Sequence, residues 1–234
     1  MNWRSSVGDV PFIPEKRIEQ DAELLLAEYA RDQCVAVSSP VPIEEVLEVQ
    51  LKLTFEIDDL REKFGSQDVL GAIWFKNGLV KVDASLDPHA YPQMLGRFRF
   101  TLAHEIGHWR LHRQLYREDP SQAHLFGGHG QPAFVCRSSD KPSVEWQADN
   151  FASYALMPKK LVVTAWQEWQ GNLDPVALSS LPPATGGGGR DPDNIRLDRF
   201  AKPLAERFEV SAEAMRIRLE KLGLLLRERP NTLF

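Results

Sequence analysis

The segment HEIGH at residues 104–108 constrains the fold of this chain more than any other feature. Residues four apart lie on one face of an α-helix, so its two histidines reach one metal ion together if the segment is helical. Glu105 would then point to the side, where its carboxylate can take a proton from a metal-bound water. The flanking residues are apolar at helical spacing, and we expect a long helix over residues 94–116.

A metal bound by His104 and His108 needs a further ligand, because a catalytic zinc usually has three protein ligands and one open position. His112 follows in the sequence but is too far away. On a straight helix it lies about 12 Å beyond His104, whereas both groups would have to approach the metal at ~2 Å. We therefore expect His112 at the helix end or behind a ligand.

Glu145 is the better candidate for the third ligand, near the start of a second expected helix at residues 143–157. Asp149 lies four residues later on the same face. Its carboxylate could accept a hydrogen bond from the non-ligating nitrogen of a metal-binding histidine. An isolated pair of acids would also fit a solvated helix face, but the position of this pair, after HEIGH and beside an apolar stripe, favours the metal.

The remaining pattern predicts an α+β fold. Residues 15–33 repeat apolar positions at helical spacing, and a second helix at 43–50 follows two prolines. Three strand candidates come next, at residues 51–57, 69–75 and 79–85. An Asn-Gly pair, which is typical of a tight hairpin, separates the last two candidates. We expect a small, mostly antiparallel sheet after the N-terminal helices.

Composition divides the chain into three parts. We expect a domain at residues 1–170, a flexible linker at 171–194 that contains PP and GGGG, and a C-terminal helical region at 195–234. Residues 117–142 are rich in Gly, Pro, Ser and Asp and are interpreted as a long loop or insertion. The C-terminal region predicts two amphipathic helices, similar to a helix-turn-helix.

Charge and cysteine content exclude several classes of protein. The net charge of −5 disfavours a nucleic-acid binder. Residues 195–229 carry nine Lys/Arg and six Asp/Glu, which is too little basicity to favour direct DNA binding. Two cysteines without a CxxC pair exclude a cysteine-based zinc finger. No apolar run is long enough to cross a bilayer or to form a signal peptide, so we expect a cytoplasmic protein without a membrane partner.

Two longer segments carry a resemblance to a known family. FTLAHEIGHWRLHR, followed by EWQADNFASYALMP, resembles the ImmA/IrrE family of bacterial and phage metallo-endopeptidases, which have gluzincin-like HExxH…E sites. The hairpin GAIWFKNGLVKVDASLD and the tail PLAERFEVSAEAMRIRLEKLGLL extend it over roughly residues 20–225. The resemblance implies a minimal zincin-like core with the C-terminal helices as an appendage. It also implies metal ligands at His104, His108 and Glu145, and Glu105 as general base.

The resemblance further implies a zinc-dependent endopeptidase, in which metal-activated water attacks the peptide bond. Zn²⁺ is the expected cofactor and Mn²⁺ the alternative. The implied substrate is a helix-turn-helix transcriptional repressor or a related regulatory protein. The rival hypothesis is a non-hydrolytic regulator, or a toxin–antitoxin-type partner, that binds a repressor without cleaving it. The presence of Glu105 favours the enzyme, since a pure binding module has no need of that carboxylate.

Two further parts of a peptidase site stay open at this point. Hydrolysis requires a donor to the developing oxyanion, and the sequence offers His112, His124, His129 and Tyr154 without choosing among them. A zincin also needs a strand that pairs with an extended peptide. We expect the strand at residues 79–85 to be that sheet edge.

Overall fold

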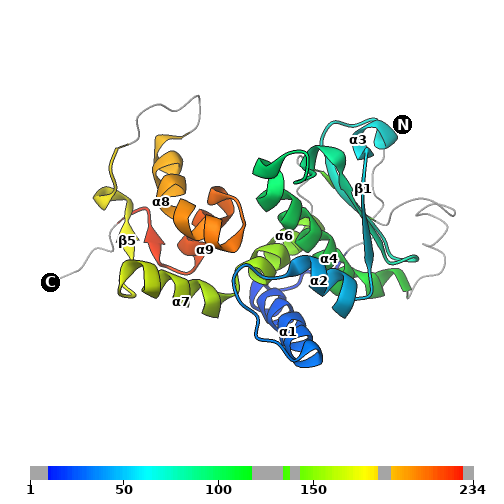
Figure 1. Cartoon of the computed structure of the whole chain (residues 1–234), viewed down its shortest axis with the longest axis horizontal. Coiled ribbons are helices and arrows are strands. Elements are labelled where there is room, and N and C mark those ends of the chain that lie inside the picture. Colours follow the sequence, from blue (N-terminus) through cyan, green and yellow to red (C-terminus); the bar gives the residue numbers. More distant parts are fainter. Residues whose placement is uncertain (1–9, 118–133, 138–142, 184–190, 229–234) are drawn as a thin grey trace. The chain divides into compact units, whose positions relative to one another are not determined.

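The computed structural model describes residues 10–117, 134–137, 143–183 and 191–228 (Figure 1). The chain forms two compact units, Met1–Val37 with Pro42–Ala155 and Ser38–Val41 with Leu156–Phe234. Among the described residues, no helix combines the length and the apolar character that crossing a membrane requires. Each unit is described in turn.

Helices open the first unit, as the spacing of apolar residues predicts. Helix α1 (Glu15–Gln33) buries Ile18, Leu25 and three other residues on one face. A short helix α2 (Ile43–Glu45) continues into a π-helical turn, η1 (Val46–Gln50). Helix α3 (Leu60–Phe64) falls between the first two strands in the sequence, and the side chain of Asp59 caps its N-terminus.

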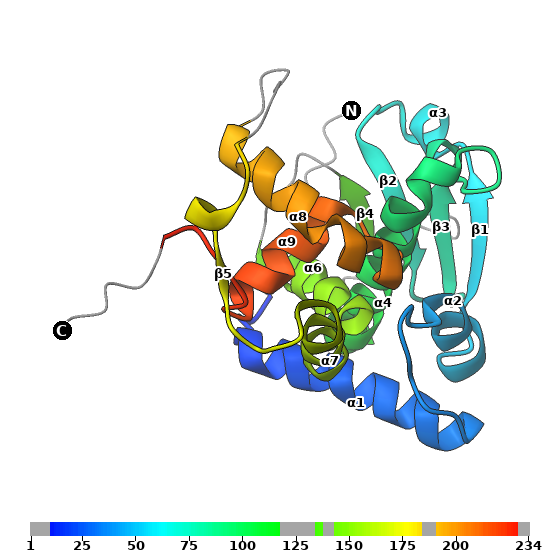
Figure 2. The same cartoon turned by 60° about the vertical axis from the view of Figure 1, so that its left-hand side comes forward.

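The sheet of the first unit has four strands among the described residues. They are β1 (Thr54–Asp58), β2 (Val69–Trp74), β3 (Leu79–Asp83) and β4 (Phe134–Arg137). Their order is β1-β3-β2-β4 (Figure 2). The predicted hairpin forms between β2 and β3, and β2 also pairs antiparallel with β4, whereas β1 joins β3 in parallel. The α+β class with a small sheet is therefore confirmed.

Two expectations about this sheet are wrong. The strand predicted over residues 79–85 is not an edge, because β1 pairs along its outer side. The edges formed by described residues are β1 and β4. In addition, residues 134–137 form a strand inside the segment interpreted as a loop. Four residues are too few to show a period against a Gly- and Pro-rich background, and pairing with β2 stabilises this strand.

Two glycines set how closely the elements around the HEIGH segment pack. Helix α4 (Leu95–Arg117) carries this segment and packs against β2 and β3. A Cβ atom at Gly71 would lie 2.6 Å from Cγ2 of Thr101 and 2.7 Å from Oε1 of Glu105. A Cβ atom at Gly107 would lie 3.1 Å from Cα of Ala148 on helix α6 (Ser143–Leu156). The missing side chains therefore allow α4 to lie directly against both the sheet and α6.

The second unit is mostly helical. It contains α7 (Lys159–Gln170), β5 (Val176–Ala177), η4 (Leu178–Ser180), α8 (Pro192–Phe208), α9 (Ala212–Lys221) and β6 (Leu225–Leu226). Strands β5 and β6 pair in parallel, and α8 packs against α9. Ser211 caps α9 by accepting a hydrogen bond from the backbone of Ala214. The structure groups α7 with this unit and places β5 within residues 171–194, and the division at residue 170 stays a prediction.

Candidate metal centre

Three potential ligand atoms converge where α4 passes α6. Nε2 of His104 lies 3.0 Å from Nε2 of His108 and 3.1 Å from Oε2 of Glu145. Nε2 of His108 lies 3.5 Å from Oε1 of Glu145. All three residues are buried. The cluster exists because the two histidines are one helical turn apart, and because Gly107 admits α6 to close contact.

The separations within this cluster fit a bound metal ion. A tetrahedral zinc ion with ligands at 2.0–2.2 Å holds neighbouring ligand atoms about 3.3–3.6 Å apart, and the observed distances of 3.0, 3.1 and 3.5 Å lie within a few tenths of an ångström of this range. In the part of the chain that the structure describes, His104, His108 and Glu145 form a group whose ligand atoms lie within 4.8 Å of one another. The sequence-predicted ligands are thus brought together.

The protonation of these residues also suits a cation. Although burial opposes its ionisation, the neighbouring His108 and His104 hold the pKa of Glu145 well below its usual range. Burial lowers the pKa of His108, against the opposing effect of Glu145. The cluster therefore offers an anionic oxygen from Glu145 and a neutral imidazole from His108, which are the forms that bind metal ions.

Asp149 supports His104 from the side away from the cluster. Its Oδ1 lies 2.9 Å from Nδ1 of His104. The carboxylate accepts the hydrogen bond, so Nδ1 carries the proton and Nε2 presents its lone pair to the cluster. The side chain of Asp149 is 58% exposed, and the interaction is thus at the border of the solvent.

His112 lies behind His108 rather than in the cluster. Its Nδ1 is 3.0 Å from Nδ1 of His108, and its Nε2 is 3.0 Å from Oε1 of Gln147. Burial, with a further contribution from His108, lowers the pKa of His112 to about 4, and the ring is neutral at pH 7. Gln147, placed between Glu145 and Asp149 on α6, was missed by the sequence reasoning.

Glu105 is fully buried against β2, at the position where Gly71 leaves room for it. Neither of its carboxylate oxygens has a hydrogen-bond partner among the described residues. Burial raises the pKa of Glu105 to about 8. Because buried polar groups are almost always hydrogen-bonded, an orphaned carboxylate next to a ligand cluster is typical of a group that acts on a bound molecule.

Two of the four candidates for the oxyanion donor, Tyr154 and His112, form hydrogen bonds within the first unit. The hydroxyl of Tyr154 donates a hydrogen bond to the carboxylate of Glu15 on α1, and His112 is engaged as described above. His124 and His129 lie outside the described residues.

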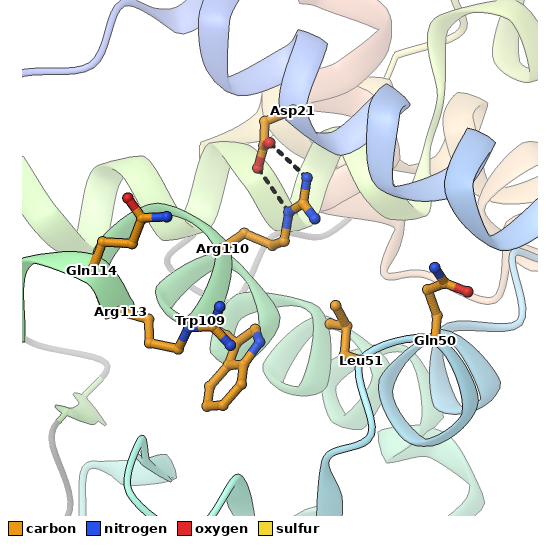
Figure 3. Close-up of a pocket in the computed structure, with 7 residues that line it drawn as sticks. All are labelled: Asp21, Gln50, Leu51, Trp109, Arg110, Arg113 and Gln114. Carbon is orange, nitrogen blue, oxygen red and sulfur yellow. Dashed lines mark hydrogen bonds and ion pairs between the residues drawn. The ribbon is translucent and has the colours of Figure 1, made fainter. Parts of the chain in front are cut away.

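The opposite face of α4 is anchored to α1 beside an open polar cavity of about 350 Å³ (Figure 3). Arg110 donates two hydrogen bonds to Asp21, at 2.8 and 3.2 Å, and one to Glu28 at 3.1 Å. Arg110 follows His108 by two residues, which turns it about 200° around the helix. These ion pairs therefore fix the helix from behind without entering the cluster. The cavity is lined by Asp21, Gln50, Leu51, Trp109, Arg110, Arg113 and Gln114.

An α+β unit that brings an HExxH helix and a carboxylate from a following helix to one buried point defines a metallopeptidase-type centre. The model of the IrrE N-terminal-like domain family, Peptidase_M78, matches residues 89–220, and the chain belongs to this family. The resemblance given by the sequence is thereby confirmed. Family and cluster together indicate a bound metal ion.

No curated protein matches the chain. A solved structure described as a Mycobacterium tuberculosis transcriptional regulator is similar at 13% identity, over 94% of this chain and 54% of that chain, with a TM-score of 0.45. The present chain thus spans about half the length of that structure.

Proposed function

We propose that this protein is a zinc-dependent endopeptidase that cleaves a regulatory protein. The observation that carries the proposal is the convergence of His104, His108 and Glu145 next to the orphaned carboxylate of Glu105. A cluster that only stabilised the fold would have no use for a second buried acid that lacks a partner.

The donor set favours zinc over manganese. Two imidazole nitrogens and one carboxylate are a common set for catalytic zinc, whereas manganese favours carboxylate, carbonyl and water oxygens. His104, His108 and Glu145 would hold the ion. When bound, zinc supplies a Lewis acid that activates water and polarises the peptide carbonyl.

Glu105 would act as the general base. Its carboxylate can accept a proton from water and deliver it to the leaving amine, because no protein hydrogen bond among the described residues competes for its oxygens. Positive charge at the neighbouring cluster favours the ionised form of Glu105 and offsets the effect of burial on its pKa.

An extended substrate would pair with β4. This edge strand lies beside β2, and Gly71 of β2 is paired with Cys136 of β4. Glu105 packs on β2 at Gly71, so the edge is one inter-strand spacing, about 4.8 Å, from the strand that contacts the general base. Strand addition there would align a peptide beside the cluster. The other edge, β1, is two strands away from β2 in the sheet order.

The family favours a protein substrate, and we propose a helix-turn-helix repressor or a related regulator. The test is incubation of the zinc-loaded full chain with helix-turn-helix repressors encoded beside the gene, and with casein as a general substrate, followed by mass spectrometry of the products. The matched control is Glu105→Gln, which keeps the shape and the three ligands. Cleavage by the wild type but not by the variant supports the enzyme. Stable binding of a repressor without cleavage by either protein would instead establish the non-hydrolytic regulator.

A further inference from the structure

A row of hydrogen bonds runs from the N-terminal segment to the ligand cluster. Nε2 of Gln147 donates to the backbone carbonyl of Pro11 at 3.2 Å. Oε1 of Gln147 lies 3.0 Å from Nε2 of His112, and Nδ1 of His112 lies 3.0 Å from Nδ1 of His108. The three side chains of this row are fully buried. The row is thus shielded from water that could substitute for any of its members.

The backbone carbonyl of Pro11, at the start of the row, fixes the direction of every hydrogen bond in it. A backbone carbonyl only accepts, so the amide nitrogen of Gln147 faces Pro11 and its oxygen faces His112. That oxygen can only accept, which places the proton of the neutral His112 ring on Nε2 and leaves Nδ1 with a lone pair. Nδ1 of His108 must then donate to His112. The lone pair of His108 is consequently on Nε2, the atom that faces the cluster.

We propose that His112 is a positioning residue for metal binding, which selects the tautomer and the ring orientation of His108. This inference rests on the proposed function in requiring a metal ion at the cluster. His108 without an acceptor behind it could carry its proton on either nitrogen, and the tautomer protonated at Nε2 has no lone pair on the atom that faces the cluster. The two proposed ligand histidines thus have different hydrogen-bond acceptors. His108 donates to the ring of His112, and His104 donates to the carboxylate of Asp149.

Packing of the N-terminal segment maintains the start of the row. The rings of Phe12 and Trp146 stack with centroids 6.0 Å apart and an interplanar angle of 17°. Trp146 precedes Gln147 on α6, and so the stack holds the carbonyl of Pro11 over the amide that it orients. Residues 90 positions or more before the histidines in the sequence therefore help to orient the ring that lies behind His108.

The test compares two replacements of His112 that are similar in shape to each other. Asn places an oxygen near the position of Nδ1 and can accept a hydrogen bond from His108. Leu has nearly the shape of Asn and cannot accept. Metal-free full-length wild type, His112→Leu and His112→Asn are titrated with Zn²⁺ against a competing chelator. The visible absorption of bound Co²⁺ reports the arrangement of the ligands in each. We expect Leu to lower zinc affinity by about 10–100-fold, and Asn to restore most of it.

A second variant keeps the test decisive if the Leu variant does not fold. Gln147→Met removes the oxygen that accepts from His112 and should weaken zinc binding. Leu25→Ala on α1, which empties a fully buried position outside the row, controls for a general loss of stability and should bind zinc as the wild type does.

The outcomes separate this inference from the proposed function. Zinc binding that is equal in all variants, or weakened equally by Leu and Asn, would overturn the positioning role and leave the proposed enzyme intact. Failure of the wild type itself to bind zinc would overturn the function and the inference with it.

Discussion

The two compact units use buried charged groups in different ways. In the second unit, Arg216 donates to Asp198 at 2.7 Å and to Glu220 at 3.1 Å, and Arg218 donates to the backbone carbonyl of Met157 at 2.9 Å. In the first unit, His104, His108 and Glu145 converge on one point, and the neighbouring Glu105 has no hydrogen-bond partner among the described residues. Charges that satisfy one another stabilise a fold, whereas a cluster that leaves an acid unsatisfied indicates a ligand.

Removing a buried ion pair of the second unit should have the greatest effect on the free energy of unfolding. Arg216→Met removes the guanidinium but leaves the nearly buried carboxylate of Asp198. Removal of one partner of a buried ion pair typically costs about 3–5 kcal/mol. We expect this loss in the free energy of unfolding, measured by urea denaturation of the metal-free chain, with zinc affinity unchanged in the folded protein.

The matched control is an exposed pair on the same unit. Lys202 lies 3.7 Å from Glu206, and both side chains are more than half exposed. Lys202→Met should cost no more than about 0.5 kcal/mol. A loss of zinc affinity in Arg216→Met would contradict the separation of roles between the units.

Removing a proposed metal ligand of the first unit should instead reduce zinc affinity. Glu145→Ala removes the only carboxylate of the ligand cluster, and we expect zinc affinity to fall by more than about 100-fold, beyond the usual effect of a residue that only supports a ligand. Elemental mass spectrometry of the purified protein and chelator competition measure it. Retention of one equivalent of zinc would exclude Glu145 as the third ligand.

The exposed carboxylate behind His104 should contribute less to zinc affinity than a ligand does. Asp149→Ala removes the acceptor of His104, and we expect zinc affinity to fall by about 10-fold, at the low end of such effects, because water can replace a half-exposed carboxylate. Asp149→Asn keeps an acceptor oxygen and should bind more tightly than the alanine variant. A greater loss for Asp149→Ala than for His112→Leu would reverse the order that burial predicts.

Local spacing was sufficient to predict much of this site. His104, Glu105 and His108 are defined by one helical turn, and the Glu145–Asp149 pair by the next helix. The helices around them were predictable because each has a long apolar period.

Contacts between distant segments could not be predicted in the same way. Strand β4 forms through pairing with β2, and β3 is interior because β1 adds to it, which no local pattern reveals. The importance of Gly71 depends on the helix that crosses it. Gln147 resembles any polar helix residue until Pro11 and His112 are seen on either side of it.

A weaker effect is expected at Asp58 on the first unit, which forms ion pairs with the half-exposed Lys63 and the partly buried Lys81. Hydrogen bonds from Lys63 and Lys81 lower the pKa of Asp58 to about 2. Because the folded pKa lies below the unfolded value of about 3.9, this stabilisation is present above pH 4 and is lost as the pH falls towards 2. These ion pairs are solvent-screened, so we expect less than about 1 kcal/mol. Urea denaturation of wild type and Asp58→Asn between pH 2 and 5 measures it: the two stability curves should converge as the pH falls, and a constant difference would show that the charge of Asp58 is not responsible.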